Sequence, residues 1–173
     1  MKKLMCIFLL LLPICQGCLE TPKNGGIPKD AAICLQIQHS RRIPHNIIIV
    51  HIEDVNGRYT LQADTKPMEG QPSSNQYPPF RNVKTLSNEQ YEELLSLLNS
   101  LHWNKLKKKE TNIIGLDGST WALTYRQNQI ENTVSIWSPD YETRERNLQD
   151  FLKVCRFLLR EADIDPQTSM PNN

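Results

Sequence analysis

The sequence lacks a hydrophobic stretch long enough to cross a membrane and remain there. Its longest apolar run starts at Leu4 and is interrupted at Pro13. That is about half of the ~20 residues that a membrane-spanning helix needs. Lys2 and Lys3 precede the run, and this combination is typical of a secretory signal. We therefore expect an exported chain rather than a membrane-spanning one.

An excess of charge of either sign is also missing. Lysine and arginine together number 20 and aspartate and glutamate 19 among 173 residues. Removal of the signal would take Lys2 and Lys3 with it and leave a nearly neutral chain. Proteins that bind nucleic acid normally carry a strong basic excess. We therefore expect no nucleic-acid partner.

Motifs of the common enzyme families are missing as well. The chain has no G-x-S-x-G, H-E-x-x-H or G-x-x-x-x-G-K, the patterns that place a nucleophile, a zinc pair or a phosphate-binding loop. The stretch GLDGS at 115–119 has the wrong spacing, and a hairpin turn explains its Asp-Gly pair. We expect a protein that is not an enzyme, with no catalytic residues, no metal ligands and no cofactor.

The apolar run is followed by ICQGC at residues 14–18. This stretch resembles the lipobox of bacterial lipoproteins, in which a small residue precedes a cysteine that receives diacylglycerol. Gly17 and Cys18 match that pattern, whereas Cys15 and Gln16 depart from its usual residues. The resemblance implies removal of residues 1–17 and a lipid anchor on Cys18. Because Leu19 rather than aspartate comes next, it also implies the outer membrane, facing the periplasm.

The cysteine count agrees with export. Of five cysteines, Cys6 and Cys15 leave with the signal and Cys18 takes the lipid. Cys34 and Cys155 remain, an even number that suits an oxidising compartment. They form either a disulfide or two separate buried thiols. The pattern places Cys34 on the polar side of a strand and Cys155 on the apolar stripe of a helix, so both alternatives stay open.

Composition divides the exported chain into three parts. Residues 18–31 contain Pro and Gly-Gly and are predicted to be the lipidated terminus and a flexible tether. Residues 32–162 have the length of a single domain, with a long proline-rich loop over 64–85. Residues 163–173 form a polar tail that we expect to be disordered.

Local signals indicate the elements of the domain. An Asn-Gly pair at 56–57 predicts a hairpin between strands 47–55 and 58–63 whose register places Ile52 opposite Leu61. An Asp-Gly pair at 117–118 predicts a second hairpin between 111–116 and 119–126. Further strands are expected near 33–38 and 133–137.

Two helices complete the predicted domain. Ser87 and Gln90 form a capping box that begins a helix ending near 101–103. Apolar residues at steps of three and four predict another helix over 143–162. The predicted fold class is α+β, an antiparallel sheet built from hairpins with two helices packed on one face.

Candidate binding residues are few. Trp137 is out of phase with Val134 and Ile136, so we expect it to be exposed for partner recognition. The cluster Lys107, Lys108 and Lys109 is a second candidate for partner binding, although a solvated turn also explains it.

The histidines offer a third candidate. His39, His45 and His51 are spaced by six residues, and His45 with His51 and Glu53 is a candidate metal site. Solvated surface histidines are the favoured interpretation, since metal ligands are usually spaced more tightly.

These observations favour a lipid-anchored, non-enzymatic envelope protein that acts as a protein-binding module. A narrower form is an immunity or inhibitor protein that neutralises a toxin. The alternatives are a small periplasmic metal-binding protein or enzyme and a structural lipoprotein of envelope assembly. The segment Leu116–Pro139 resembles a segment of small bacterial exported proteins, and this likeness implies no activity.

Overall fold

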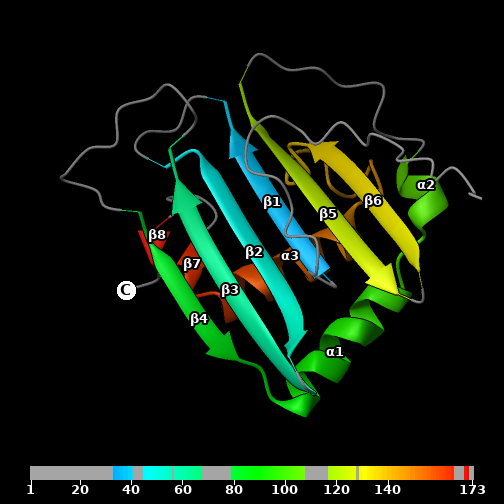
Figure 1. Cartoon of the computed structure of the whole chain (residues 1–173). Coiled ribbons are helices and arrows are strands. Elements are labelled where there is room, and N and C mark those ends of the chain that lie inside the picture. The colour runs from blue at the N-terminus through cyan, green and yellow to red at the C-terminus, as the bar shows by residue number, and fades with distance from the viewer. Residues whose placement is uncertain are drawn as a thin grey trace, which may run out of the picture.

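The computed structural model describes residues 33–40, 45–55, 57–67, 79–107, 117–127, 129–165 and 170–171. It has an α+β fold with one six-stranded antiparallel sheet, in the order β4-β3-β2-β1-β5-β6 (Figure 1). The strands are β1 (Ile33–His39), β2 (Ile47–Val55), β3 (Arg58–Lys66), β4 (Arg81–Thr85), β5 (Ser119–Gln127) and β6 (Ile130–Trp137). The helices are α1 (Asn88–Asn99), α2 (Trp103–Lys107) and α3 (Gln149–Glu161).

The β2–β3 pair has the predicted register. Ile52 lies opposite Leu61 and Val50 opposite Ala63, and all four side chains are buried. Gly57 adopts a positive φ of 76° in the turn, and its N–H donates to the Asp54 carboxylate at 2.8 Å. The turn therefore needs glycine at this position, because other residues are strained there.

β1 is an inner strand, paired with β2 on one side and β5 on the other. β5 also pairs with β6, so both of its edges are occupied. The predicted hairpin between 111–116 and β5 is therefore wrong, because a long-range partner has taken that edge. Residues 111–116 themselves lie outside the described ranges.

Two stretches predicted to be irregular contain strands. The predicted loop over 64–85 is wrong at both ends, because β3 continues to Lys66 and β4 covers Arg81–Thr85. The tail holds a short antiparallel pair, β7 (Ile164–Asp165) and β8 (Met170–Pro171), so the prediction of disorder is wrong for those residues.

The core is formed by residues of both the sheet and the helices. Leu35, Val50 and Leu123 from the sheet are fully buried in one cluster with Leu98 of α1 and Leu158 of α3. Figure 1 shows α3 crossing behind the central strands. None of the helices in the described ranges combines the length and the apolar composition that crossing a bilayer requires.

The two longer helices begin differently. α1 begins with the predicted capping box, in which the Ser87 hydroxyl accepts from Gln90 N and the Gln90 side chain accepts from Ser87 N. α3 was expected from 143 but starts at Gln149, after a turn-rich stretch. Its N-cap, Leu148, makes no side-chain cap hydrogen bond.

Candidate functional site

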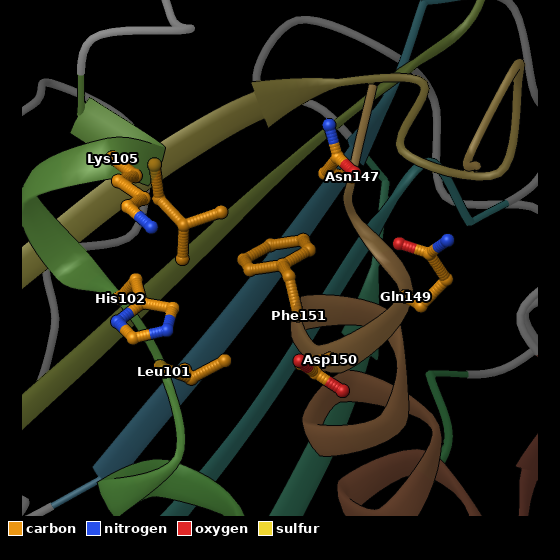
Figure 2. Close-up of a pocket in the computed structure, with 8 residues that line it drawn as sticks. Leu101, His102, Lys105, Asn147, Gln149, Asp150 and Phe151 are labelled. Carbon is orange, nitrogen blue, oxygen red and sulfur yellow. The ribbon is translucent and has the colours of Figure 1, made fainter. Parts of the chain in front are cut away.

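A pocket of about 630 Å³ lies where the α1–α2 connection meets the start of α3 (Figure 2). Its volume is in the range of small-ligand sites, which is ~300–1,000 Å³. Phe151, Leu106 and Leu101 line it with apolar surface and are themselves almost fully buried. The exposed lining residues are polar: His102, Lys105, Asn147, Gln149 and Asp150.

The polar residues stand on two opposing walls. In Figure 2, His102 and Lys105 are on one wall and Asn147, Gln149 and Asp150 on the other, with the Phe151 ring between them. Asp150 forms an ion pair with Lys153 at 2.9 Å. Lys105 forms no ion pair with any residue in the described ranges. The pocket lining therefore combines an apolar floor with one lysine and one carboxylate, and the carboxylate is engaged by Lys153.

The stretch 138–147, which we call the stapled loop, leads from β6 to this pocket. Ser138, Glu142 and Asn147 adopt φ values of 37°, 47° and 49°. Such conformations cost free energy for residues other than glycine and persist only where the surroundings impose them. The backbone of this loop is therefore held in shape by other contacts.

Arg146 supplies most of that restraint. Its guanidinium donates to the carbonyl oxygens of Trp137 (2.8 Å), Ser138 (2.7 Å) and Tyr141 (3.0 Å). Thr143 adds a hydroxyl donor to the Pro139 carbonyl at 3.0 Å. A planar guanidinium that reaches three carbonyls fixes both their direction and their spacing.

The base of the stapled loop is joined to the start of β5. Ser138 N donates to the Ser119 carbonyl at 2.7 Å, and Trp121 Nε1 donates to the Ser119 hydroxyl at 2.7 Å. A Cβ at Gly118 would meet the Ser138 hydroxyl and approach the Trp137 ring to 2.9 Å. Glycine at 118 therefore allows the close contact that seats the loop.

The outer part of the stapled loop is open to solvent. Tyr141 is 55% exposed, and Glu142, Arg144 and Glu145 beside it are exposed too. The pKa of Tyr141 is raised by a hydrogen bond to Glu142 and by the charge of that carboxylate. The loop thus presents an exposed aromatic ring on a backbone that is already fixed.

The residues predicted as partner sites fall in different places. Trp137 is half-buried, at the base of the stapled loop, so the expectation of an exposed ring is only partly met. Lys107 is exposed at the end of α2. Lys108, Lys109 and the lipidation residue Cys18 lie outside the described ranges.

The expectation that the histidines are solvated at the surface is wrong. His39, His45 and His51 are only 8%, 1% and 5% exposed, because β1 and β2 are inner strands and His45 lies buried just before β2. His51 Nε2 lies 3.4 Å from the Glu53 carboxylate. Across the ranges described, no three His, Cys, Asp or Glu side chains gather where they could hold a metal ion.

Both predicted thiols are free and buried. Cys155 belongs to the core cluster, whereas Cys34 alternates with Ile33 and Leu35 and points to the other face of the sheet. Burial raises the pKa of Cys34 to about 12 and that of Cys155 well above its ordinary value. Neither thiol is therefore a reactive thiolate at neutral pH.

The pocket and the stapled loop were missed by sequence reasoning. Residues 143–148 were assigned to the last helix, and His102 and Lys105 to a helix end and a charged turn. The glutamate and arginine pattern of 142–147 suits a helix surface, so the sequence gives no local sign of the loop. Neither family models, curated proteins nor solved structures gave a match to this chain.

Proposed function

We propose that this protein is a lipid-anchored, non-enzymatic module of the bacterial envelope that binds another protein through the stapled loop. The observation that carries the proposal is the combination of an exposed Tyr141 with a backbone fixed by Arg146. The site is non-covalent, and the protonated, buried thiols of Cys34 and Cys155 support a role without cysteine chemistry.

A fixed loop suits protein recognition for an energetic reason. Ordering a flexible loop costs binding free energy, and a loop that is ordered beforehand avoids much of that cost. Tyrosine is enriched in the residues that dominate binding energy, since its ring buries a large area and its hydroxyl still forms a hydrogen bond. An immunity or inhibitor protein that neutralises a toxin is the narrower form of this proposal.

The proposed arrangement of the helices gives the loop its setting. We place α1 and α3 on the same face of the sheet. Tyr59 of β3 stacks on Tyr91 of α1 with ring centroids 3.4 Å apart. Asn82 and Lys84 of β4 contact the end of α3, at distances of 3.1 Å and 2.9 Å. Tyr59 shares its side of β3 with the buried Leu61, and so both contacts support a single helix-covered face.

Membrane attachment rests on Cys18, with residues 18–31 as the tether to an outer membrane facing the periplasm. The test is Cys18→Ser, followed by fractionation and mass spectrometry of the full chain. We expect the variant to leave the membrane fraction and to lose the mass of the lipid. Unchanged mass and unchanged membrane retention would overturn the anchor.

Partner binding is tested by site-specific photo-crosslinking in intact cells. A photoreactive amino acid replaces Tyr141 in one strain and Glu131, exposed on β6, in a matched control strain. We expect a discrete crosslinked protein from position 141 and none from position 131. The same products from both positions, or no product from 141, would contradict the proposal.

A further inference from the structure

The pocket beside the stapled loop combines features that one type of ligand satisfies. Its floor is the Phe151 ring with Leu101 and Leu106, which offers apolar contact. Lys105 on the α2 wall carries a positive charge that no carboxylate in the described ranges neutralises. An apolar body with a negative charge beside it fits both features.

The α3 wall of the pocket does not cancel the preference for a negatively charged ligand. Asp150 is the carboxylate of the pocket, and the Lys153 ammonium holds it at 2.9 Å. The same wall is the first turn of α3, whose N-cap Leu148 supplies no side-chain acceptor. The N–H groups of a first helical turn have no partner within the helix and favour a negative ligand atom. These N–H groups add to the attraction that the Lys105 charge has for a negative ligand, but they do not replace that charge.

We propose that the pocket binds the C-terminal residue of a partner polypeptide, with an apolar side chain against Phe151 and the terminal carboxylate at Lys105. A C-terminal leucine or phenylalanine places an apolar group and a carboxylate on one residue, whereas an internal aspartate or glutamate lacks the apolar body. Capture of a C-terminal carboxylate is an established mode of peptide recognition.

This inference rests on the proposed function and gives its partner a chemical feature. Asn147 is both the last residue of the stapled loop and a lining residue of the pocket. The stapled loop therefore links Tyr141 to the pocket lining along the chain. The pocket would recognise the end of the partner chain, and the loop would contact its folded surface.

The experiment titrates the full lipidated chain in detergent micelles with three probes. Two are fluorescent hexapeptides that end in leucine, one with a free carboxylate and one with a carboxamide. The third is 4-methylpentanoate, which has the apolar body and carboxylate without a peptide. We expect the free carboxylate peptide to bind about tenfold more tightly than the amide, the ratio that ~1.4 kcal/mol gives.

Two variants assign the effect to the pocket. Lys105→Met keeps most of the side-chain length, removes the charge, and is expected to abolish the difference between the two peptides. Arg156→Met is the matched control, because it removes an exposed positive charge from α3 outside the pocket lining. It should keep the full difference.

Three results would overturn the inference. They are equal binding or no binding of the two peptides, a difference that persists in Lys105→Met, and tighter binding of 4-methylpentanoate than of the carboxylate peptide. The last result would identify a free carboxylic acid as the occupant. If crosslinking from position 141 continues in spite of any of these results, the pocket assignment fails while the proposed function stands.

Discussion

The starts of α1 and α3 are built in opposite ways. α1 begins at a complete capping box of Ser87 and Gln90. α3 begins after the buried Leu148, without a side-chain cap and after a loop held in strained conformations. At the start of α1, backbone N–H groups are capped by side chains only three positions apart in the chain. The loop before α3 is held by the guanidinium of Arg146 and by contacts with β5.

The start of α1 contributes to the stability of the core, whereas the start of α3 is available for binding. Gln90 caps α1 and also donates to the buried Glu161 near the end of α3 at 2.6 Å, so the start of α1 is built into the core. The start of α3 lines an open pocket instead. Strained and unsatisfied backbone concentrates at functional sites, which is why we place binding there rather than at α1.

The largest expected effect comes from removing the guanidinium of Arg146, which holds the stapled loop. Arg146→Met leaves three carbonyl oxygens without their charged donor. Hydrogen bonds to charged groups contribute ~1.5–3 kcal/mol each when buried, and these are partly exposed, so we expect a loss of about 3 kcal/mol in the free energy of unfolding. Urea denaturation followed by circular dichroism measures it.

Arg146→Lys is the control for charge. Lysine keeps the positive charge but cannot reach three carbonyls with a planar fork. We expect it to lose most of the same stability and to reduce crosslinking from position 141. A lysine variant as stable as the wild type would show that charge alone, and not the fork, holds the loop.

Gln90→Ala should break the other helix start with a smaller effect. It removes half of the capping box and the donor to Glu161. We expect a loss of about 2 kcal/mol in the free energy of unfolding, the sum of a modest cap and one hydrogen bond to a charged group. Crosslinking from position 141 should be unchanged, because α1 does not hold the stapled loop.

Gln90→Glu distinguishes the two roles of Gln90. Glutamate keeps the acceptor of the capping box but places a second carboxylate beside Glu161. If the cap dominates, this variant is nearly as stable as the wild type. We expect instead a loss at least equal to that of Gln90→Ala at neutral pH, because the link to Glu161 is the more buried interaction.

Low pH should weaken the interactions of the Glu161 carboxylate. Burial alone would raise the pKa of Glu161, but hydrogen bonds from Lys84 and Arg160 and their charges lower it overall. A lowered folded-state pKa gives stability that is present above the unfolded value of about 4.3 and is lost as the pH falls through the folded one. The stability difference between wild type and Glu161→Gln should therefore shrink below about pH 4. A constant difference would contradict this.

The same comparison shows what sequence could predict. The capping box, the β2–β3 register and the apolar stripe of α3 depend on neighbours in the chain, and the structure has all three. The pairing of β1 with β5 joins residues 80 to 92 positions apart, and no local pattern predicts it. Residues 143–147 of the stapled loop were predicted as helix, because the positive φ values of the loop fall on Ser138, Glu142 and Asn147 and not on glycines that would mark a turn.

The smallest expected effect tests the strain itself. Glu142 is exposed with a φ of 47°, a conformation that costs other residues ~1–2 kcal/mol relative to glycine. Glycine also loses more backbone entropy on folding, so we expect Glu142→Gly to raise the free energy of unfolding by only about 0.5 kcal/mol. Glu142→Ala keeps the strain and should give no such gain.

Both Glu142 variants remove the carboxylate that raises the pKa of Tyr141. Absorbance titration should therefore show Tyr141 ionising at a lower pH in each of them, whereas only the glycine variant becomes more stable. The titration reports on the Glu142 carboxylate, and the free energy of unfolding reports on the backbone conformation of residue 142. A stability gain in the alanine variant would mean that the Glu142 carboxylate, and not its backbone conformation, is the unfavourable feature of the loop.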